Sequence, residues 1–338
     1  MRDDFCCMAY EHCCVCPKRC GVNRNKGEKG FCGETADLRV AWAGLHFGEE
    51  PPITGRGGSG TIFITGCNLA CSFCQNFQIS HENMGAVVSR DELSMLCLCL
   101  QENGAENINI VTGSHAVPAL INGLQAAKQR GLVIPVLWNT SSYETIESIE
   151  ALCTVVDGWL PDLKTMDTQL AEQLFAAPDY PAYAQAAIMA MAAHSPLHID
   201  TTLSDYPFGL LRSGVIVRHL ALPHHVQDTE VFLTWFSQHL KNKALLSLMT
   251  QYTPVAQRCK AQSKAIFPER FLTEAEDVHL RELLADFAID DGFYQELVID
   301  DSWLPDFNMV QTFASSLSKP LWHWKNGWVG EAPLKGLR

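Results

Sequence analysis

The sequence predicts an α/β protein built on a partial (β/α)6 barrel of the TIM type, with a Cys-rich N-terminal extension and a C-terminal helical extension. From residue 60 onward, short apolar runs alternate with amphipathic segments, which is typical of βα units around a parallel sheet. The five to seven such units are fewer than the eight of a closed barrel. A doubly wound sheet is the alternative. In both folds, catalytic residues lie on loops that leave the C-terminal ends of strands.

The apolar runs and the capping signals place the individual elements. Strands are expected at 61–65, 107–112, 133–138, 156–160, 197–202, 215–222 and 245–251. Helices are expected at 89–100, 116–130, 141–153, 180–194, 229–241 and 273–287. Ser89 with Glu92 forms a capping box, and Gly104 suits the position after that helix. Ser141 with Glu144 is expected to cap the third helix in the same way.

Composition divides the chain into three predicted segments. Residues 1–55 form a Cys-rich, metal-binding N-terminal segment, and the Pro/Gly stretch at 51–58 is interpreted as a linker. Residues 56–256 form the barrel, and residues 257–338 an acidic, Trp-rich C-terminal extension. The tryptophans of this extension are expected to cover the barrel or to pack within the extension itself; they are Trp303, Trp322, Trp324 and Trp328.

The chain has 338 residues and 14 cysteines, ten of them before residue 75. The first residues carry no apolar signal-peptide core, and no uncharged apolar run approaches the ~18 residues of a membrane span. These features predict a cytoplasmic protein whose cysteines bind metal or stay reduced. The net charge is −13, and residues 269–306 alone hold 12 acidic side chains. Such a surface argues against nucleic-acid binding and is typical of a solvated helix face, with a partner-docking tail as the alternative.

The most specific motif follows the first predicted strand. Cys67, Cys71 and Cys74 form a CxxxCxxC loop. Three thiolates on one loop can hold a [4Fe–4S] cluster and leave the fourth iron open to a small molecule. A structural zinc site requires four protein ligands instead. The spacing also differs from that of bacterial ferredoxins.

With Phe73 before the third cysteine, this loop resembles the signature of the radical S-adenosylmethionine (SAM) superfamily. The whole sequence looks most like the uncharacterised members related to pyruvate formate-lyase activating enzyme. The stretches that carry the resemblance are CVCPKRCGVNRNKGEKGFCG (14–33), GSGTIFITGCNLACSFCQN (58–76), NINIVTGSHAVP (107–118), IPVLWNTSSYE (134–144), LPDLK (160–164), VIVRHLALP (215–223) and SLMTQYTP (247–254).

The resemblance implies an oxidoreductase with a [4Fe–4S] cluster on Cys67, Cys71 and Cys74 and with SAM on the open iron. One electron, from a donor such as flavodoxin or ferredoxin, then cleaves SAM to a 5′-deoxyadenosyl radical that abstracts hydrogen. The leading hypothesis for the substrate is a glycyl radical protein. The alternatives are a radical SAM enzyme that acts on a small molecule and a non-catalytic iron–sulfur or zinc protein.

The resemblance also implies roles for residues at the ends of strands. Phe73 would contact adenine, unless it is an ordinary core aromatic. Thr112 stands where many members carry a Gly-Gly-Glu motif that holds the SAM ammonium group. Asn139 and Thr140 can hydrogen-bond ribose or the SAM carboxylate, although this segment also reads as a helix cap.

Three further residues are expected in the catalytic site. Asp162 and Lys164 match the Asp-X-Lys pattern of glycyl-radical activating enzymes, in which the lysine contacts the SAM carboxylate. Strand alternation puts both on one face, and a surface ion pair is the alternative. Arg218 interrupts an apolar strand, so it requires a carboxylate partner from SAM or from the protein. His219 is expected on the opposite face, with a structural role.

A second set of cysteines lies near the N-terminus. Cys13, Cys16, Cys20 and Cys32 provide four ligands with no open position, which fits structural Zn²⁺ or a second iron–sulfur cluster. Nearby basic residues favour thiolates at these positions. Cys14 is an alternative to Cys13. The remaining cysteines receive no metal role; they are Cys6, Cys7, Cys97, Cys99, Cys153 and Cys259.

Overall fold

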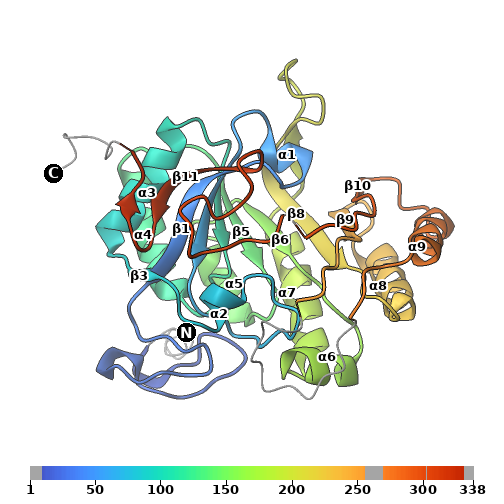
Figure 1. Ribbon diagram of the computed structural model, residues 1–338, viewed down its shortest axis with the longest axis horizontal. Helices are drawn as coiled ribbons and strands as arrows, with labels where there is room; N and C mark the ends of the chain where they lie inside the picture. Colours follow the sequence, from blue (N-terminus) through green and yellow to red (C-terminus); the bar gives the residue numbers. More distant parts are fainter. Residues whose placement is uncertain (1–9, 256–268, 302, 331–338) are drawn as a thin grey trace.

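A computed structural model of the protein describes residues 10–255, 269–301 and 303–330. Cys6, Cys7 and Cys259 lie outside these residues, as does the predicted boundary at residue 256. The described strands join in one strongly curved sheet with helices packed around it (Figure 1). No described helix is long and apolar enough to cross a bilayer.

Six parallel strands form the centre of the sheet in the order of the chain. They are β2 (Ser59–Ile64), β4 (Ile108–Val111), β5 (Val136–Thr140), β6 (Gly158–Pro161), β8 (Leu210–Leu220) and β9 (Leu245–Met249). Each pairs in parallel with the next one along. The open (β/α)6 fold class is therefore confirmed. The predicted strand at 197–202 is instead the short β7 (His198–Asp200), which pairs antiparallel with β8 outside the central order.

Helices connect the parallel strands, as the sequence pattern predicts. They are α2 (Phe77–Ser80), α3 (Arg90–Glu102), α4 (Val117–Gln129), α5 (Ile146–Leu152), α6 (Thr168–Phe175), α7 (Tyr180–His194) and α8 (Val226–His239), and α9 (Glu274–Asp286) follows in the extension. The Ser89–Glu92 capping box is present, and Gly104 has φ 89° just after α3. The cap predicted at Ser141 is wrong, because Thr145 accepts the hydrogen bond from Ser148 N and α5 begins at Ile146. Helix α6 was not expected.

The N-terminal segment contributes a central strand that the sequence analysis missed. β1 (Arg39–His46) is almost fully buried and pairs antiparallel with β2. A strand buried on both faces has no polar–apolar alternation, so the run VAWAGL carries no period-2 signal. The expected linker is also wrong in part, because Pro51–Thr54 forms the helical turn α1 with Pro52 and Ile53 buried.

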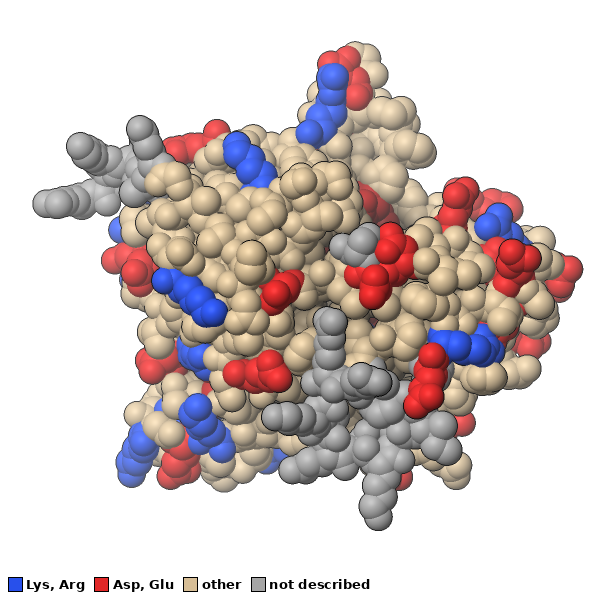
Figure 2. Space-filling view, viewed as in Figure 1, with Lys and Arg blue, Asp and Glu red and all other residues tan. Residues whose placement is uncertain are grey.

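The remaining strands extend the sheet at its two ends. β11 (Ser318–His323) pairs antiparallel with β1 and with β12 (Gly327–Trp328), and β3 (Ala86–Val87) also pairs with β1. At the other end, β10 (Gly292–Tyr294) pairs in parallel with β9. All three predicted segments thus supply strands to one sheet, and the C-terminal extension is helical only at α9 among its described residues. Acidic side chains gather over the α9 part of the face in Figure 2.

The two faces of the sheet have different surroundings. One face packs on the helices through a large apolar core that includes Trp138 and Trp159. The other face lines the barrel interior, where Ile53 of α1 packs with Leu137, Leu160, Leu211 and Ile216. These contacts lie near the N-terminal ends of the strands, so α1 closes that end of the barrel. Its opposite end, where the strand C-termini meet, carries the predicted site residues.

The C-terminal extension covers part of the barrel interior. Phe307 and Phe313 pack on Trp42 and Phe63, with edge-to-face rings between Trp42 and Phe313. The Trp42 indole also donates to Val310 O. In Figure 1, this red segment crosses in front of β1 and the neighbouring strands. The extension therefore does cover the barrel, although phenylalanines rather than the predicted tryptophans make these apolar contacts.

Candidate iron–sulfur site

The CxxxCxxC loop leaves the C-terminal end of β2 and is held by backbone contacts at several points. Ala70 N and Ser72 N donate to Phe175 O and Leu174 O at the end of α6. Upstream, Gly66 N donates to Ile79 O of α2. These bonds fix the loop from both sides, so the cysteines are positioned by the scaffold and not by a metal alone.

The three cysteine thiols of this loop lie close to one another and to Lys164. Burial raises the pKa of Cys67 to about 12 and also raises the pKa values of Cys71 and Cys74. The positive charge of Lys164 acts in the opposite direction on all three. Among the described residues, no three His, Cys, Asp or Glu side chains converge on one point that a single ion could occupy. A four-iron cluster does not require this, since each thiolate binds a different iron. The donors therefore fit such a cluster.

Lys164 and Asp162 come together after β6, as predicted. Lys164 Nζ lies 2.6 Å from Asp162 Oδ2, and both side chains are largely buried. Burial alone would lower the pKa of Lys164, but Asp162 and Cys71 outweigh this effect and raise it. The Tyr180 hydroxyl, which the sequence analysis missed, accepts from Lys164 N and donates to Asp162 O. These two hydrogen bonds fix the backbone that carries the charged Lys164 beside the thiols.

Phe73 lies in the core beside the loop. Its ring centroid is 5.9 Å from that of Phe175 and 5.7 Å from that of Tyr252, and only 7% of the residue is exposed. These contacts fix the shape of the loop between Cys71 and Cys74. Contact of Phe73 with adenine stays a prediction.

The segment after β4 has an unusual backbone at the position of the Gly-Gly-Glu motif. Thr112 has φ 64°, a left-handed conformation that β-branched residues rarely adopt. At Gly113, an added Cβ would lie 2.3 Å from the Trp138 ring, so only glycine fits. Strained backbone of this kind is often found at functional sites. This backbone lies at the end of β4, where the resemblance implies the SAM ammonium.

Asn139 and Thr140, the last two residues of β5, lie on opposite faces of the sheet. Asn139 pairs in register with Leu160 and Val111 and is half-buried. The Thr140 hydroxyl donates to Glu144 Oε1 at 2.7 Å, so the hydrogen bond that this hydroxyl donates is made within the protein. Ser114 and the Trp138 indole donate to the same oxygen. Glu144 Oε2 is buried with no hydrogen-bond partner among the described residues. Glu144 is thus a buried carboxyl group and not the capping-box partner of Ser141 that the sequence predicts.

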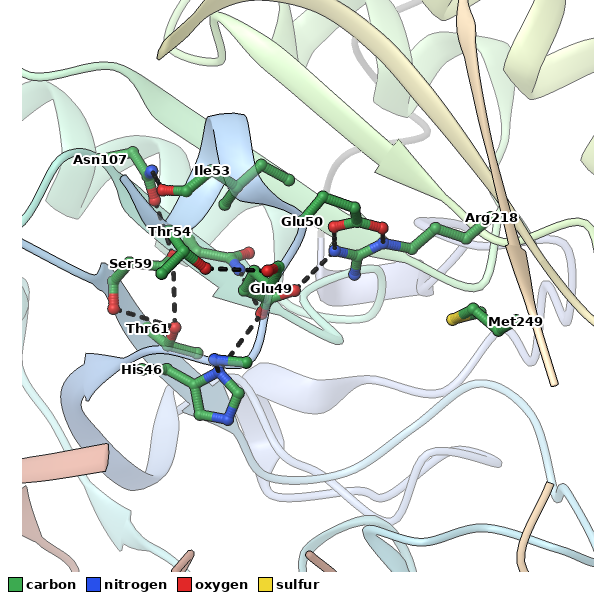
Figure 3. A network of polar contacts seen from close by, with 12 residues as sticks. His46, Glu49, Glu50, Ile53, Thr54, Ser59, Thr61, Asn107, Arg218 and Met249 are labelled. Carbon is green, nitrogen blue, oxygen red and sulfur yellow. Dashed lines mark hydrogen bonds and ion pairs between the residues drawn. The ribbon is translucent and has the colours of Figure 1, made fainter. Parts of the chain in front are cut away.

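Arg218 finds its carboxylate partners within the protein. Its guanidinium group binds Glu49 and Glu50, which lie just before α1 (Figure 3). Burial would raise the pKa of Glu50, but Arg218 outweighs this and lowers it. Glu49 also accepts from Asn109 Nδ2 at 3.0 Å. The structure therefore gives Arg218 a structural partner set; a catalytic role remains a prediction. His219 is structural as expected, because its ring bonds Leu163 O and Thr229 Oγ1.

The four predicted N-terminal cysteines also come together. Cys13, Cys16, Cys20 and Cys32 line one small cavity, which is shared with Lys18, Arg24 and His115 among others. This cavity lies next to the cluster loop. An added Cβ at Gly66 would lie 3.0 Å from Cys32 O, and a charge on Cys32 acts on Cys67. Cys97 and Cys99 are buried on α3, in agreement with a packing role.

The family comparison concerns the segment that contains the CxxxCxxC loop. Residues 53–170 match the family described as a 4Fe-4S single cluster domain. This segment is therefore similar to iron–sulfur domains, in agreement with the predicted [4Fe–4S] cluster.

Three further proteins are similar to this chain. The uncharacterised protein MJ0674 of Methanocaldococcus jannaschii is 29% identical over 253 residues, which cover 72% of this chain and 67% of that protein. The structure of Streptococcus suis SuiB bound to S-adenosylmethionine has a TM-score of 0.48 at 14% identity, covering 68% of this chain and 47% of SuiB. A domain of pyruvate-formate lyase-activating enzyme from Bacteroides vulgatus has a TM-score of 0.35 at 13% identity, covering 53% and 91%. The match thus spans about half the length of SuiB.

The buried ion cluster predicts a stability change at Glu50. We expect Glu50→Gln to lower the free energy of unfolding by roughly 3 kcal/mol at pH 7, because it removes one partner of a buried guanidinium. The folded pKa of Glu50 is depressed, so this stabilisation is present above the ordinary pKa of 4.5 and is lost as the pH falls through the lower folded pKa. Urea unfolding of the anaerobic apoprotein at several pH values measures both effects. The matched control is Asp205→Asn, at an exposed ion pair with Arg56, which should cost less than ~1 kcal/mol. Equal effects of the two variants would contradict the assignment.

The buried carboxyl of Glu144 predicts the opposite dependence on pH. Burial raises the pKa of Glu144 above its ordinary value of 4.5, so the folded state holds this proton where the unfolded state has lost it. Stability must then fall as the pH rises from about 4.5 through the folded pKa. Glu144→Gln keeps an oxygen acceptor for Ser114 and Thr140 and removes the charge. The unfolding free energy of the wild type relative to this variant should therefore fall between pH 4.5 and 8. A constant difference across that range would refute the prediction.

Proposed function

We propose that the chain is a radical SAM enzyme in which SAM binds the open iron of the cluster on Cys67, Cys71 and Cys74. The observation that carries this proposal is the placement of three half-buried thiols and the Lys164–Asp162 pair at one end of a (β/α)6 barrel, in a segment that matches a 4Fe–4S domain family. When bound, the reduced cluster supplies the electron that cleaves SAM to a 5′-deoxyadenosyl radical. The residues of the chain provide the binding, orientation and exclusion of water that this chemistry needs.

Lys164 is the residue best placed to hold an anionic group next to the cluster. It stays protonated, since Asp162 and Cys71 raise its pKa, and Tyr180 fixes its backbone. A carboxylate of SAM would take the place of Asp162 as one partner of this ammonium group or share the group with it. The half-buried Asn139 and the left-handed backbone at Thr112 lie at the neighbouring strand ends. They would complete the polar contacts to SAM.

The proposed substrate is a glycyl radical protein, with an electron donor such as flavodoxin or ferredoxin. This part rests on the sequence resemblance to glycyl-radical activating enzymes, including the Asp162-X-Lys164 pattern. A small molecule is the competing substrate. Anaerobic capture with the full chain separates the two. Transfer of deuterium from a glycine-labelled protein partner into 5′-deoxyadenosine supports activation, whereas transfer only from a small molecule rejects it.

The two cysteine sets predict different losses of function. With reduced cluster and SAM under anaerobic conditions, Cys71→Ala should form no 5′-deoxyadenosine, because one of three cluster ligands is gone. Cys16→Ala should mainly lower metal content or solubility, and the cluster that remains should still cleave SAM. Cys99→Ala, at a buried cysteine outside both sites, is the control. Liquid chromatography of the nucleoside products measures the outcome. No 5′-deoxyadenosine from wild type with an intact cluster would overturn the proposed function, and equal loss in Cys71→Ala and Cys16→Ala would overturn the division of roles.

The role of Lys164 predicts a change in SAM affinity. Lys164→Met keeps most of the apolar volume and removes the charge, so we expect the Kd of SAM to rise about 10- to 100-fold, as for loss of a charge-assisted contact. Isothermal titration under anaerobic conditions measures it, with iron content as a check on the cluster. Lys128→Met, at a partly exposed pair with Asp157, is the matched control. An unchanged Kd in Lys164→Met, with iron intact, would exclude the lysine as a SAM contact.

A further inference from the structure

A serine outside the CxxxCxxC motif contacts one of its thiols. Ser80 is the last residue of α2, and its Oγ atom lies 3.2 Å from Cys74 Sγ, within hydrogen-bond distance for sulfur. Either group can donate while Cys74 is a thiol. Metal binds the thiolate, which carries no proton, so in a cluster-bound protein only the hydroxyl can donate.

The Ser80 hydroxyl also approaches a carbonyl oxygen whose lone pairs are already used. Ser80 Oγ lies 3.0 Å from Asn76 O. This carbonyl oxygen accepts from Ile79 N at 3.1 Å and from Ser80 N at 3.0 Å. A carbonyl oxygen has two lone pairs, so these backbone bonds satisfy it. A thiolate is the stronger acceptor because it is charged. The hydroxyl proton is therefore directed to Cys74 once this sulfur is ionised.

Backbone contacts fix the position of Ser80 relative to the cluster loop. Ile79 O accepts from Gly66 N at 2.9 Å, which ties α2 to the residue before Cys67. Ile79 is only 2% exposed, so this helical turn is also anchored in the core. The hydroxyl is thus held beside the sulfur by the scaffold, and no movement of the backbone is needed to place it there.

A fixed donor on a ligating sulfur changes the free energy of electron uptake. Reduction by one electron adds a negative charge to an iron–sulfur cluster, and hydrogen bonds to its sulfurs help to set its reduction potential. The O–H dipole stabilises the more negative, reduced state, and half-buried surroundings screen this effect less than water does. We propose that Ser80 is a positioning residue for reduction of the cluster, in which its hydroxyl donates to Cys74 Sγ and raises the reduction potential.

This inference rests on the proposed function, because it requires a cluster on the three cysteines of the loop. Backbone groups bond the same thiols: Leu69 N donates to Cys67 Sγ at 3.4 Å, and the backbone of Asn76 bonds Cys74. A side-chain substitution leaves these backbone donors in place, whereas it can remove the Ser80 hydroxyl. Ser80 is therefore a position where one substitution adjusts the potential without loss of a ligand.

A redox titration of the full chain, reconstituted anaerobically and without SAM, tests the proposal. Dithionite is the reductant, and electron paramagnetic resonance of the reduced cluster gives the midpoint potential. We expect Ser80→Ala to shift the one-electron equilibrium about three- to tenfold toward the oxidised cluster, where tenfold corresponds to ~59 mV. Equal potentials in wild type and Ser80→Ala would overturn the proposal.

The matched control is Ser94→Ala, at a serine of α3 that is fully buried. Its hydroxyl has no hydrogen-bond partner among the described residues, so its loss should leave the midpoint potential at the wild-type value. A shift in Ser94→Ala equal to that in Ser80→Ala would show that loss of any serine hydroxyl has this effect, and would overturn the assignment to Ser80.

A second pair of variants separates the hydroxyl from the shape of the side chain. Ser80→Thr and Ser80→Val have similar volumes and differ by a hydroxyl against a methyl group. We expect Ser80→Thr to keep the wild-type potential and Ser80→Val to lower it. The signal comes only from chains that hold a cluster, so a lower iron content does not move the midpoint. Equal potentials in this pair would overturn the role of the hydroxyl, even where Ser80→Ala assembles no cluster.

The same measurements separate this inference from the proposed function. A wild-type protein that assembles no cluster would overturn both. A wild-type cluster that takes up an electron but does not cleave SAM would overturn the proposed function alone, since the effect of Ser80 is measured without SAM. An enzyme that cleaves SAM with the same potential in wild type and Ser80→Ala would overturn the inference on Ser80 alone.

Discussion

The ion cluster of Arg218, Glu49 and Glu50 is the interaction on which the shape of the barrel depends. Arg218 lies on β8, whereas the two carboxylates follow β1, so the link crosses the barrel interior between strands that are not neighbours in the sheet. An open sheet of six parallel strands can flatten or close. A buried guanidinium with two carboxylates allows only a narrow range of curvature, because each group is costly to bury without the others. Ile53 of the adjoining turn α1 adds apolar contacts to the same link.

The same link positions the candidate site. Asp162 forms a β-bridge with Arg218, and Leu163 N donates to Arg218 O. The backbone that carries Asp162 and Lys164 is therefore set by the strand that carries the ion cluster. Lys164 then faces thiols that come from a different strand end, beyond β2. Curvature of the sheet brings these two strand ends together, so the stability of the ion cluster and the geometry of the candidate site are physically coupled.

Much of this arrangement could be predicted from the sequence, and the failures have specific causes. The six parallel strands, the cluster loop and the pairing of Asp162 with Lys164 follow from local patterns, namely apolar periodicity and motif spacing. β1 was missed because a fully buried strand has no alternation to detect. The cap was predicted at Ser141 with Glu144 because that pair satisfies the same local rule as the observed cap, Thr145. Tyr180 was missed because its role arises from contacts across the fold, which no local spacing encodes.

Both cysteine sets illustrate one electrostatic requirement. Thiols are neutral when buried alone, and burial raises their pKa values here. To bind metal they must be thiolates, so each set needs compensating positive charge from the metal and from the protein. Lys164 supplies the protein charge at the cluster loop, and Arg24 supplies it at the N-terminal cavity. Lys164 is distant in sequence from the cysteines it serves, whereas Arg24 lies between Cys20 and Cys32. Both cations are fixed by hydrogen bonds to groups outside the cysteine set. The two cysteine motifs become candidate metal sites only because the fold places a buried cation beside each. For this reason the N-terminal cavity is treated as a candidate metal site and not only as a packing of small apolar side chains.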